Sequence, residues 1–168
     1  MKYIKAVVIV LAADILSLFV SIPFAASAKT ELKILSMICA VGVFGCMLVS
    51  FAAKTAHADR RLERTEGKAN SIAELCGMCA AAALPSALSW SALYISLSGS
   101  FDFYRIYKLI NAPFLQIYNF IERDASSNAL STGEVLAMLP TVVLPALVFA
   151  AAYLIVYLSE DVKPRKSC

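Results

Sequence analysis

Charged residues and histidine are scarce in this chain, and their scarcity excludes several classes of protein. Only 16% of the 168 residues are charged, whereas soluble domains contain about 25%. His57 is the single histidine, which excludes a histidine-based metal site and a Ser-His-Asp triad. There is no phosphate-binding glycine loop, no nucleophile elbow and no pair of hydrolytic carboxylates. We therefore expect a non-enzymatic role that requires no cofactor.

Hydrophobic residues are abundant instead. They make up 60% of the chain, against roughly 45–50% in soluble domains. This composition predicts an integral membrane protein. The chain has five cysteines, most of them inside apolar stretches, so they do not suggest the disulfide framework of a secreted domain and are expected to be reduced.

Four apolar stretches have the length of membrane-spanning helices, and they predict an all-α membrane protein. Ser131 and Glu134 fit a capping box ahead of the last stretch, as Ser71 and Glu74 do ahead of the third. The short tether after the first stretch requires the second to return antiparallel. We expect one polytopic domain over residues 1–168, with transmembrane helices at 4–26, 34–53, 72–98 and 135–158.

The first stretch also has features of a cleavable signal peptide. Its basic start is followed by an apolar run, by Pro23 and by the small residues 26–28. The apolar run is longer than a signal peptide needs, and Asp14 interrupts its centre. We expect an uncleaved first helix, with cleavage as the alternative.

The distribution of Lys and Arg predicts the orientation in the membrane. Ten of them flank the spans on the side that holds both termini and the second loop, and five lie on the other side. Both termini should therefore be cytoplasmic, in a plasma or inner membrane. The charged segment 54–70 is expected to extend the second helix, with Arg60 and Glu63 paired at i,i+3. Docking of a cytoplasmic partner or of anionic lipid headgroups is the alternative.

Residues 101–123 are neither a span nor a tether. Their polar side chains recur at helical spacing among Phe, Tyr, Ile and Leu, so a helix here has one polar and one apolar face. Pro113 should break this amphipathic helix near Asn111 into two short helices. A flat interfacial helix, a lid over the bundle and a re-entrant hairpin are the three arrangements to consider. Arg105 and Lys108 favour the first two, on the outer face, because deep insertion of a charge is costly.

Asp14 is the one acidic residue deep inside a predicted span. Ser17 and Ser21 follow it at i+3 and i+7 and give the first helix a polar stripe. A carboxylate at the centre of a bilayer costs about 2.5–3.5 kcal/mol, so Asp14 should face the bundle interior and be protonated or paired. It is a candidate for a proton, cation or substrate step. A hydrogen bond that fixes the register of the helix is the structural alternative.

Cys76 and Cys79 form a CxxC motif at the start of the third span. Thiols near a helix N-terminus can be reactive, which suggests redox or soft-metal chemistry, although no particular metal is indicated. Cys46 and Asp14 have a similar predicted depth, so these residues could form one cluster. The alternative is that the cysteines act as small residues that let transmembrane helices pack closely.

Prolines predict an opening between the helices. Pro23, Pro140 and Pro145 lie in the outer halves of their spans and Pro85 lies in the middle of the third. Each removes a backbone hydrogen bond and tends to kink its helix, so the outer halves should splay. The residues expected to line a ligand cavity there, or to form its lid, are Trp90, Tyr94, Tyr104, Tyr107 and Phe114.

Three functions follow as hypotheses. The first is a small membrane subunit or binding protein that recognises a lipid-like ligand, a larger membrane partner or a second copy of the chain within the lipid bilayer. The second is a proton-coupled transporter that uses Asp14. The third is thiol redox or soft-metal handling by Cys46, Cys76 and Cys79. Nucleic acid is excluded as a partner, because the net charge is only +3 and the basic residues flank apolar spans.

Overall fold

The computed structural model describes residues 2–25, 29–67, 72–99, 101–122, 126, 127 and 130–159, and all of their regular structure is helical. Four helices are long and apolar enough to cross a membrane, which confirms the prediction of an all-α fold with four helices of spanning length. The elements are α1 Lys2–Ala25, α2 Thr30–Glu66, α3 Ile72–Ser96, α4 Tyr104–Ile110, the 3₁₀ turn η1 Ala112–Phe114, α5 Leu115–Ile121, α6 Thr132–Ala137 and α7 Leu139–Ser159.

Helix α2 is much longer than the predicted span, because the charged segment continues it without a break. Arg60 and Glu63 form the expected i,i+3 ion pair at 2.7 Å. The helix ends at Gly67, which has a positive φ of 67° and donates its N–H to Glu63 O. Glycine is favoured here because a side chain would be strained in the left-handed conformation that closes the helix.

The last span is interrupted near its start. Ser131 and Glu134 form the predicted capping box and begin α6. Met138 then separates α6 from α7, and Pro140 lies in the first turn of α7. Proline has no backbone N–H to continue the hydrogen bonds of α6, and its ring disfavours helical geometry in the preceding residue. The predicted Ser71 cap and the predicted cleavage site at 26–28 lie outside the described residues.

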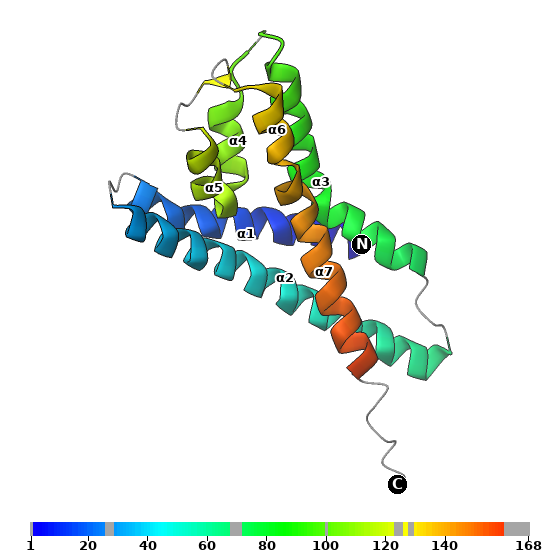
Figure 1. Ribbon diagram of the computed structural model, residues 1–168. Helices are drawn as coiled ribbons and strands as arrows, with labels where there is room; N and C mark the ends of the chain where they lie inside the picture. Colours follow the sequence, from blue (N-terminus) through cyan, green and yellow to red (C-terminus); the bar gives the residue numbers. More distant parts are fainter. Residues whose placement is uncertain are drawn as a thin grey trace.

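The four long helices form two antiparallel pairs, α1 with α2 and α3 with α7. In Figure 1 the pairs cross near one end and diverge toward the other, where α4 and α5 stand between them. Helix α1 packs on α2 and α3, and α7 also packs on α2 and α3, so α2 and α3 occupy diagonal corners of the bundle. The ribbon of α3 bends near its middle (Figure 1), where Pro85 lies inside the helix.

The prediction of a flat interfacial helix or lid over residues 101–123 is wrong. Helices α4 and α5 form an antiparallel hairpin in which α4 packs on α3 and α5 packs on α2, and the turn η1 at its tip contacts both α1 and α2 (Figure 1). The predicted break at Asn111 to Pro113 is confirmed and becomes this tip. The tip is buried, and Phe114 packs edge-on against Phe44 with ring centroids 5.9 Å apart. The segment is thus part of the core.

The buried face of the hairpin also contains polar residues beside its aromatic core. Its polar Lys108, Asn111 and Gln116 are buried, whereas its apolar Ile106 and Leu109 are exposed. The expected cost of burying Lys108 is reduced because its Nζ donates to Glu122 O at 2.8 Å and lies 4.2 Å from a tyrosine ring centroid. A segment that is surrounded by apolar helices needs hydrogen-bond partners within the protein for its polar groups, because no water is there to provide them.

A small hydrogen-bonded cluster closes the base of the hairpin. Asp102 Oδ1 accepts from the backbone amide and the hydroxyl of Ser127, both at 2.9 Å. Ser127 Oγ in turn accepts from the amides of Phe103 and Tyr104 and from the hydroxyl of Ser96. The Ser127 amide is the main reason that the pKa of Asp102 lies below its usual value. This cluster joins the end of α3 to the start of α4 and to the chain that follows α5.

The position of the hairpin tip is testable by cross-linking. Ser21 Oγ donates to Ala112 O at 3.5 Å, so the paired substitutions Ser21→Cys and Ala112→Cys place two thiols within reach of each other. In a background with the native cysteines replaced by Ser, we expect a short bifunctional thiol reagent to cross-link most of this variant, as read by protease digestion and gel mobility. Ser21→Cys with Ile106→Cys, on the exposed face of α4, is the control and should remain uncross-linked. Equal cross-linking of both pairs would contradict the buried hairpin.

Candidate functional site

The polar stripe of α1 faces the hairpin, as expected for residues that turn toward the bundle interior. Asp14, Ser17 and Ser21 are 7%, 0% and 1% exposed. Ser17 Oγ donates to Ala40 O of α2 at 3.1 Å, and Ser21 Oγ donates to Ala112 O at the hairpin tip. The two serines therefore fix α1 against its neighbours, and Asp14 lies one turn deeper on the same face.

A chain of hydroxyl groups crosses the interior beside the tip. The hydroxyls of Tyr107 and Tyr118 are 3.3 Å apart, and Tyr118 Oη lies 2.8 Å from Thr141 Oγ1 of α7. Thr141 Oγ1 donates to Met138 O, at the break between α6 and α7. The chain thus links the hairpin to the carbonyl of the irregular turn.

Three buried polar side chains have no hydrogen-bond partner within the described part of the chain. They are Asp14, Ser36 and Gln116, the last with both its amide oxygen and its amide nitrogen unpaired. An unpaired buried polar group lowers the stability of the fold by about 1–3 kcal/mol. Such a group therefore calls for an explanation, and a ligand-binding role is one.

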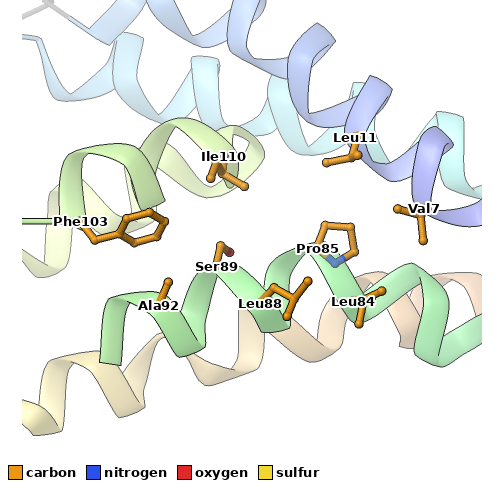
Figure 2. A pocket seen from close by; sticks show the side chains of 9 residues that line it. All are labelled: Val7, Leu11, Leu84, Pro85, Leu88, Ser89, Ala92, Phe103 and Ile110. Atoms are coloured by element: carbon orange, nitrogen blue, oxygen red, sulfur yellow. The ribbon is translucent and has the colours of Figure 1, made fainter. Parts of the chain in front are cut away.

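Next to this polar interior lies an apolar groove between α1, α3 and α4, with a volume of about 380 Å³. Figure 2 shows Val7 and Leu11 of α1 facing Pro85 and Leu88 of α3, with the hairpin closing one end. Ser89 is the single polar residue of its wall. Its hydroxyl donates to Ser86 O at 2.9 Å and accepts from Asn111 Nδ2 at 2.8 Å. The full lining is Val7, Leu11, Leu84, Pro85, Leu88, Ser89, Ala92, Phe103 and Ile110.

The aromatic residues predicted to line a cavity or form its lid lie elsewhere. Tyr104, Tyr107 and Phe114 are at most 2% exposed and form the core of the hairpin. Trp90 stacks on Tyr94 and donates its indole N–H to Val135 O of α6 at 2.9 Å, so it joins α3 to α6. None of the five is among the residues that line the groove. At least the three hairpin residues are core aromatics, because aromatic content alone does not distinguish a core from a ligand wall.

The predicted thiol cluster does not form. Cys46 is on the exposed face of α2, Cys76 is exposed on α3, and Cys79 is partly buried there, whereas Asp14 is inside. The hypothesis requires α2 and α3 to be neighbours, but they occupy diagonal corners. Across the described residues, no group of three or more His, Cys, Asp or Glu side chains is placed to hold a metal ion.

The glycine inside the CxxC motif has a packing role. A Cβ at Gly77 would lie 2.8 Å from the ring of Tyr3, so the absence of a side chain makes room for that tyrosine where α1 and α3 meet. The glycines of α2 differ, since no atom of the described residues lies within 4 Å of a Cβ built at Gly42 or Gly45, and both cysteines of α2 are exposed.

A second polar cluster, which the sequence did not reveal, lies at the end of the bundle where α1 begins. Asp59 of α2 is 2% exposed. Its two carboxylate oxygens accept separately from Lys2 Nζ of α1, at 2.5 Å, and from Tyr153 Oη of α7, at 3.0 Å. Beside it, Arg60 donates to Tyr157 O at 2.9 Å and lies over the Tyr157 ring. The charged end of α2 is therefore not simply solvated, because it anchors α1 and α7.

A sequence signal for this cluster does exist. Tyr153 and Tyr157 are four residues apart, as helical neighbours are, and they face the i,i+1 pair Asp59 and Arg60. What the sequence lacks is any sign that α2 and α7 are neighbours.

Comparison with known proteins gives no family model that matches this chain, and no curated protein or solved structure that matches it. The function must therefore be argued from the groove, the polar interior and the charged end.

The Asp59 cluster predicts a specific loss of stability. Replacing Asp59 with Asn removes the charge that holds Lys2 while preserving side-chain size, and should lower the free energy of unfolding by about 1–3 kcal/mol. The measurement is the thermal unfolding midpoint in a mild detergent. Glu66→Gln, at the exposed end of the same helix, makes the same charge change and should leave the midpoint nearly unchanged. Equal midpoints for the two variants would show that the buried ion pair contributes nothing.

Proposed function

We propose that this integral membrane protein is a non-enzymatic binding protein that holds the hydrocarbon part of a lipid-like molecule in the groove between α1, α3 and α4. The observation that carries the proposal is the lining of the groove, which is apolar except for Ser89. The Ser89 hydroxyl is already engaged by Ser86 and Asn111, so the wall offers no unpaired polar group to a ligand. The volume is at the lower end of the range for small-molecule sites, roughly 300–1,000 Å³.

Shape must supply the selectivity of such a site. Lipid tails are as apolar as leucine, so moving a chain from the bilayer into the groove gains little from the hydrophobic effect. The gain comes from close packing against rigid walls, and Pro85 and the hairpin provide them. A ligand with a bent, branched or ringed hydrocarbon part fits this requirement better than a straight chain that the surrounding lipids already supply.

The proposal includes an orientation. The basic N-terminal end of α1 and the charged C-terminal end of α2 lie at the same end of the bundle, where Lys2 contacts both Asp59 and Glu74. The excess of Lys and Arg at this end supports a cytoplasmic position for both termini, with the hairpin base on the other side. A plasma or inner membrane, and association with a larger membrane partner or a second copy, remain part of the prediction.

Filling the groove tests the proposal. Ala92→Phe places a ring in the wall and should reduce labelling by a diazirine-bearing fatty acid about tenfold, since overpacked sites exclude their ligand. Labelled peptides are identified by mass spectrometry and should come from α1 and α3 in the unmodified protein. Ala80→Phe, at an exposed position on the same helix, is the matched control and should label normally. Labelling spread evenly over all lipid-facing surfaces, and unaffected by Ala92→Phe, would refute a specific groove.

A second function is supported by a separate observation. Asp14 is buried without a hydrogen-bond partner among the described residues, and a chain of hydroxyls elsewhere in the interior runs from Tyr107 through Tyr118 to Thr141. Intramembrane carboxylates that face a bundle interior mark proton relays and ion pathways. A proton-coupled transport role that uses Asp14 is therefore our second candidate.

The proton-coupled role predicts a defect in Asp14→Asn. Asn has nearly the same size but cannot release a proton, so proton uptake into liposomes containing the purified protein should fall at least about tenfold, to the level of empty liposomes. A pH-sensitive dye inside the liposomes reports the uptake. Ser17→Ala, one turn away, removes a structural hydrogen bond and should preserve uptake. If the unmodified protein and Asp14→Asn behave alike, Asp14 is structural.

A further inference from the structure

The groove between α1 and α2 differs from the apolar groove in carrying three lysines. Near the start of α1 there is a cavity of about 380 Å³. A second cavity, of about 310 Å³, shares Phe51 and Lys54 with it and continues along the helices. The lining of the first is Lys2, Lys5, Phe51, Lys54, Thr55, Ala58 and Asp59, and the second adds Ile9, Cys46, Met47 and Ser50.

The charge of the first cavity is positive. Its one acidic residue, Asp59, has one oxygen on Lys2 and the other on Tyr153. A further acidic group, Glu74 of α3, lies 3.8 Å from the same Lys2. Lys5 and Lys54 are exposed, one on each helix, and neither forms an ion pair with a described residue. Two unneutralised ammonium groups therefore face one cavity from opposite walls.

The second cavity gives this site an apolar extension. Between Ala58 and Cys46 helix α2 rises about 18 Å, close to half of the ~30 Å hydrocarbon thickness of a bilayer. Ile9, Met47 and Phe51 line this length, so charge gives way to hydrocarbon in one direction along the groove. A cationic end followed by an apolar channel of one leaflet's depth is complementary to a phospholipid with a negative headgroup.

We propose that the α1/α2 groove binds one anionic glycerophospholipid. The phosphate lies between Lys5 and Lys54, and one acyl chain follows Ile9, Met47 and Phe51 toward Cys46. This site is independent of the ligand groove proposed above, because residues 2, 5 and 9 of α1 lie on the opposite side of the helix from residues 7 and 11. Lys2 does not hold the phosphate directly, since it is engaged by Asp59, but its charge adds to the local potential.

Native mass spectrometry of the full chain, with dioleoyl phosphatidylglycerol or phosphatidylcholine added in detergent, tests the proposal. We expect one phosphatidylglycerol molecule to bind tightly and phosphatidylcholine to bind much more weakly. Lys5→Gln with Lys54→Gln should weaken phosphatidylglycerol binding about thirtyfold, the effect of two lysines near an anionic lipid. The matched control, Lys29→Gln with Lys33→Gln, makes the same charge change at the other end of the α1/α2 pair and should change binding less than about twofold.

Two further arms distinguish the occupant. Ser50→Trp fills the exposed apolar part and should also weaken phosphatidylglycerol binding, while soluble glycerol phosphate should not compete at lipid concentrations. The proposal is overturned if the two lipids bind equally, or if both lysine pairs give the same loss. It is also overturned if glycerol phosphate binds as well as the lipid, which would indicate a soluble phosphate ligand, or if a second copy of the chain occupies the groove and excludes lipid.

Discussion

The structure depends on one constraint, which is that the irregular backbone at the tip of the α4–α5 hairpin must find hydrogen-bond partners among apolar helices, although the side chain of Gln116 in α5 finds none in the described chain. With no water in a bilayer core, irregular backbone survives there only when protein surrounds it. The tip meets this condition through Asn111, which donates to Ser89 Oγ and to Tyr107 O, and through Ala112, whose carbonyl accepts from Ser21. The divergence of the two helix pairs follows, because the space between them is the space that the hairpin occupies (Figure 1).

The two ends of the bundle are held together by different interactions. Where the helix pairs cross, stacked rings of Phe149, Tyr153 and Tyr157 run along α7 and end on the charges of Asp59 and Arg60. Where the pairs diverge, contact is made through the hairpin instead. The groove between α1, α3 and α4 lies where the hairpin separates the helix pairs, whereas the groove with the lysines lies within the α1/α2 pair, beside Asp59 at the joined end.

Sequence reasoning succeeded where a property is local or averaged over many residues. The four spans follow from hydrophobic length, the capping box of Ser131 from the affinity of its side chains for the first amides of a helix, and the break near Pro113 from the missing N–H of proline. It failed for residues 101–123. We expected this segment to lie outside the bundle because burying a charged side chain is costly. Lys108 is nevertheless buried, and its ammonium group donates to a backbone carbonyl and lies over an aromatic ring.

The sequence by itself thus determined the four spans, the inward polar stripe of Asp14, Ser17 and Ser21, and the break near Pro113, because hydropathy, capping and proline chemistry act within a few residues. Only the tertiary structure decided which helices are neighbours. That choice separates Cys46 from Cys79, brings Asp59 to Tyr153, and buries the hairpin rather than laying it flat. Helix adjacency depends on the summed fit of whole faces and on partners distant in sequence, and no short pattern of residues records it.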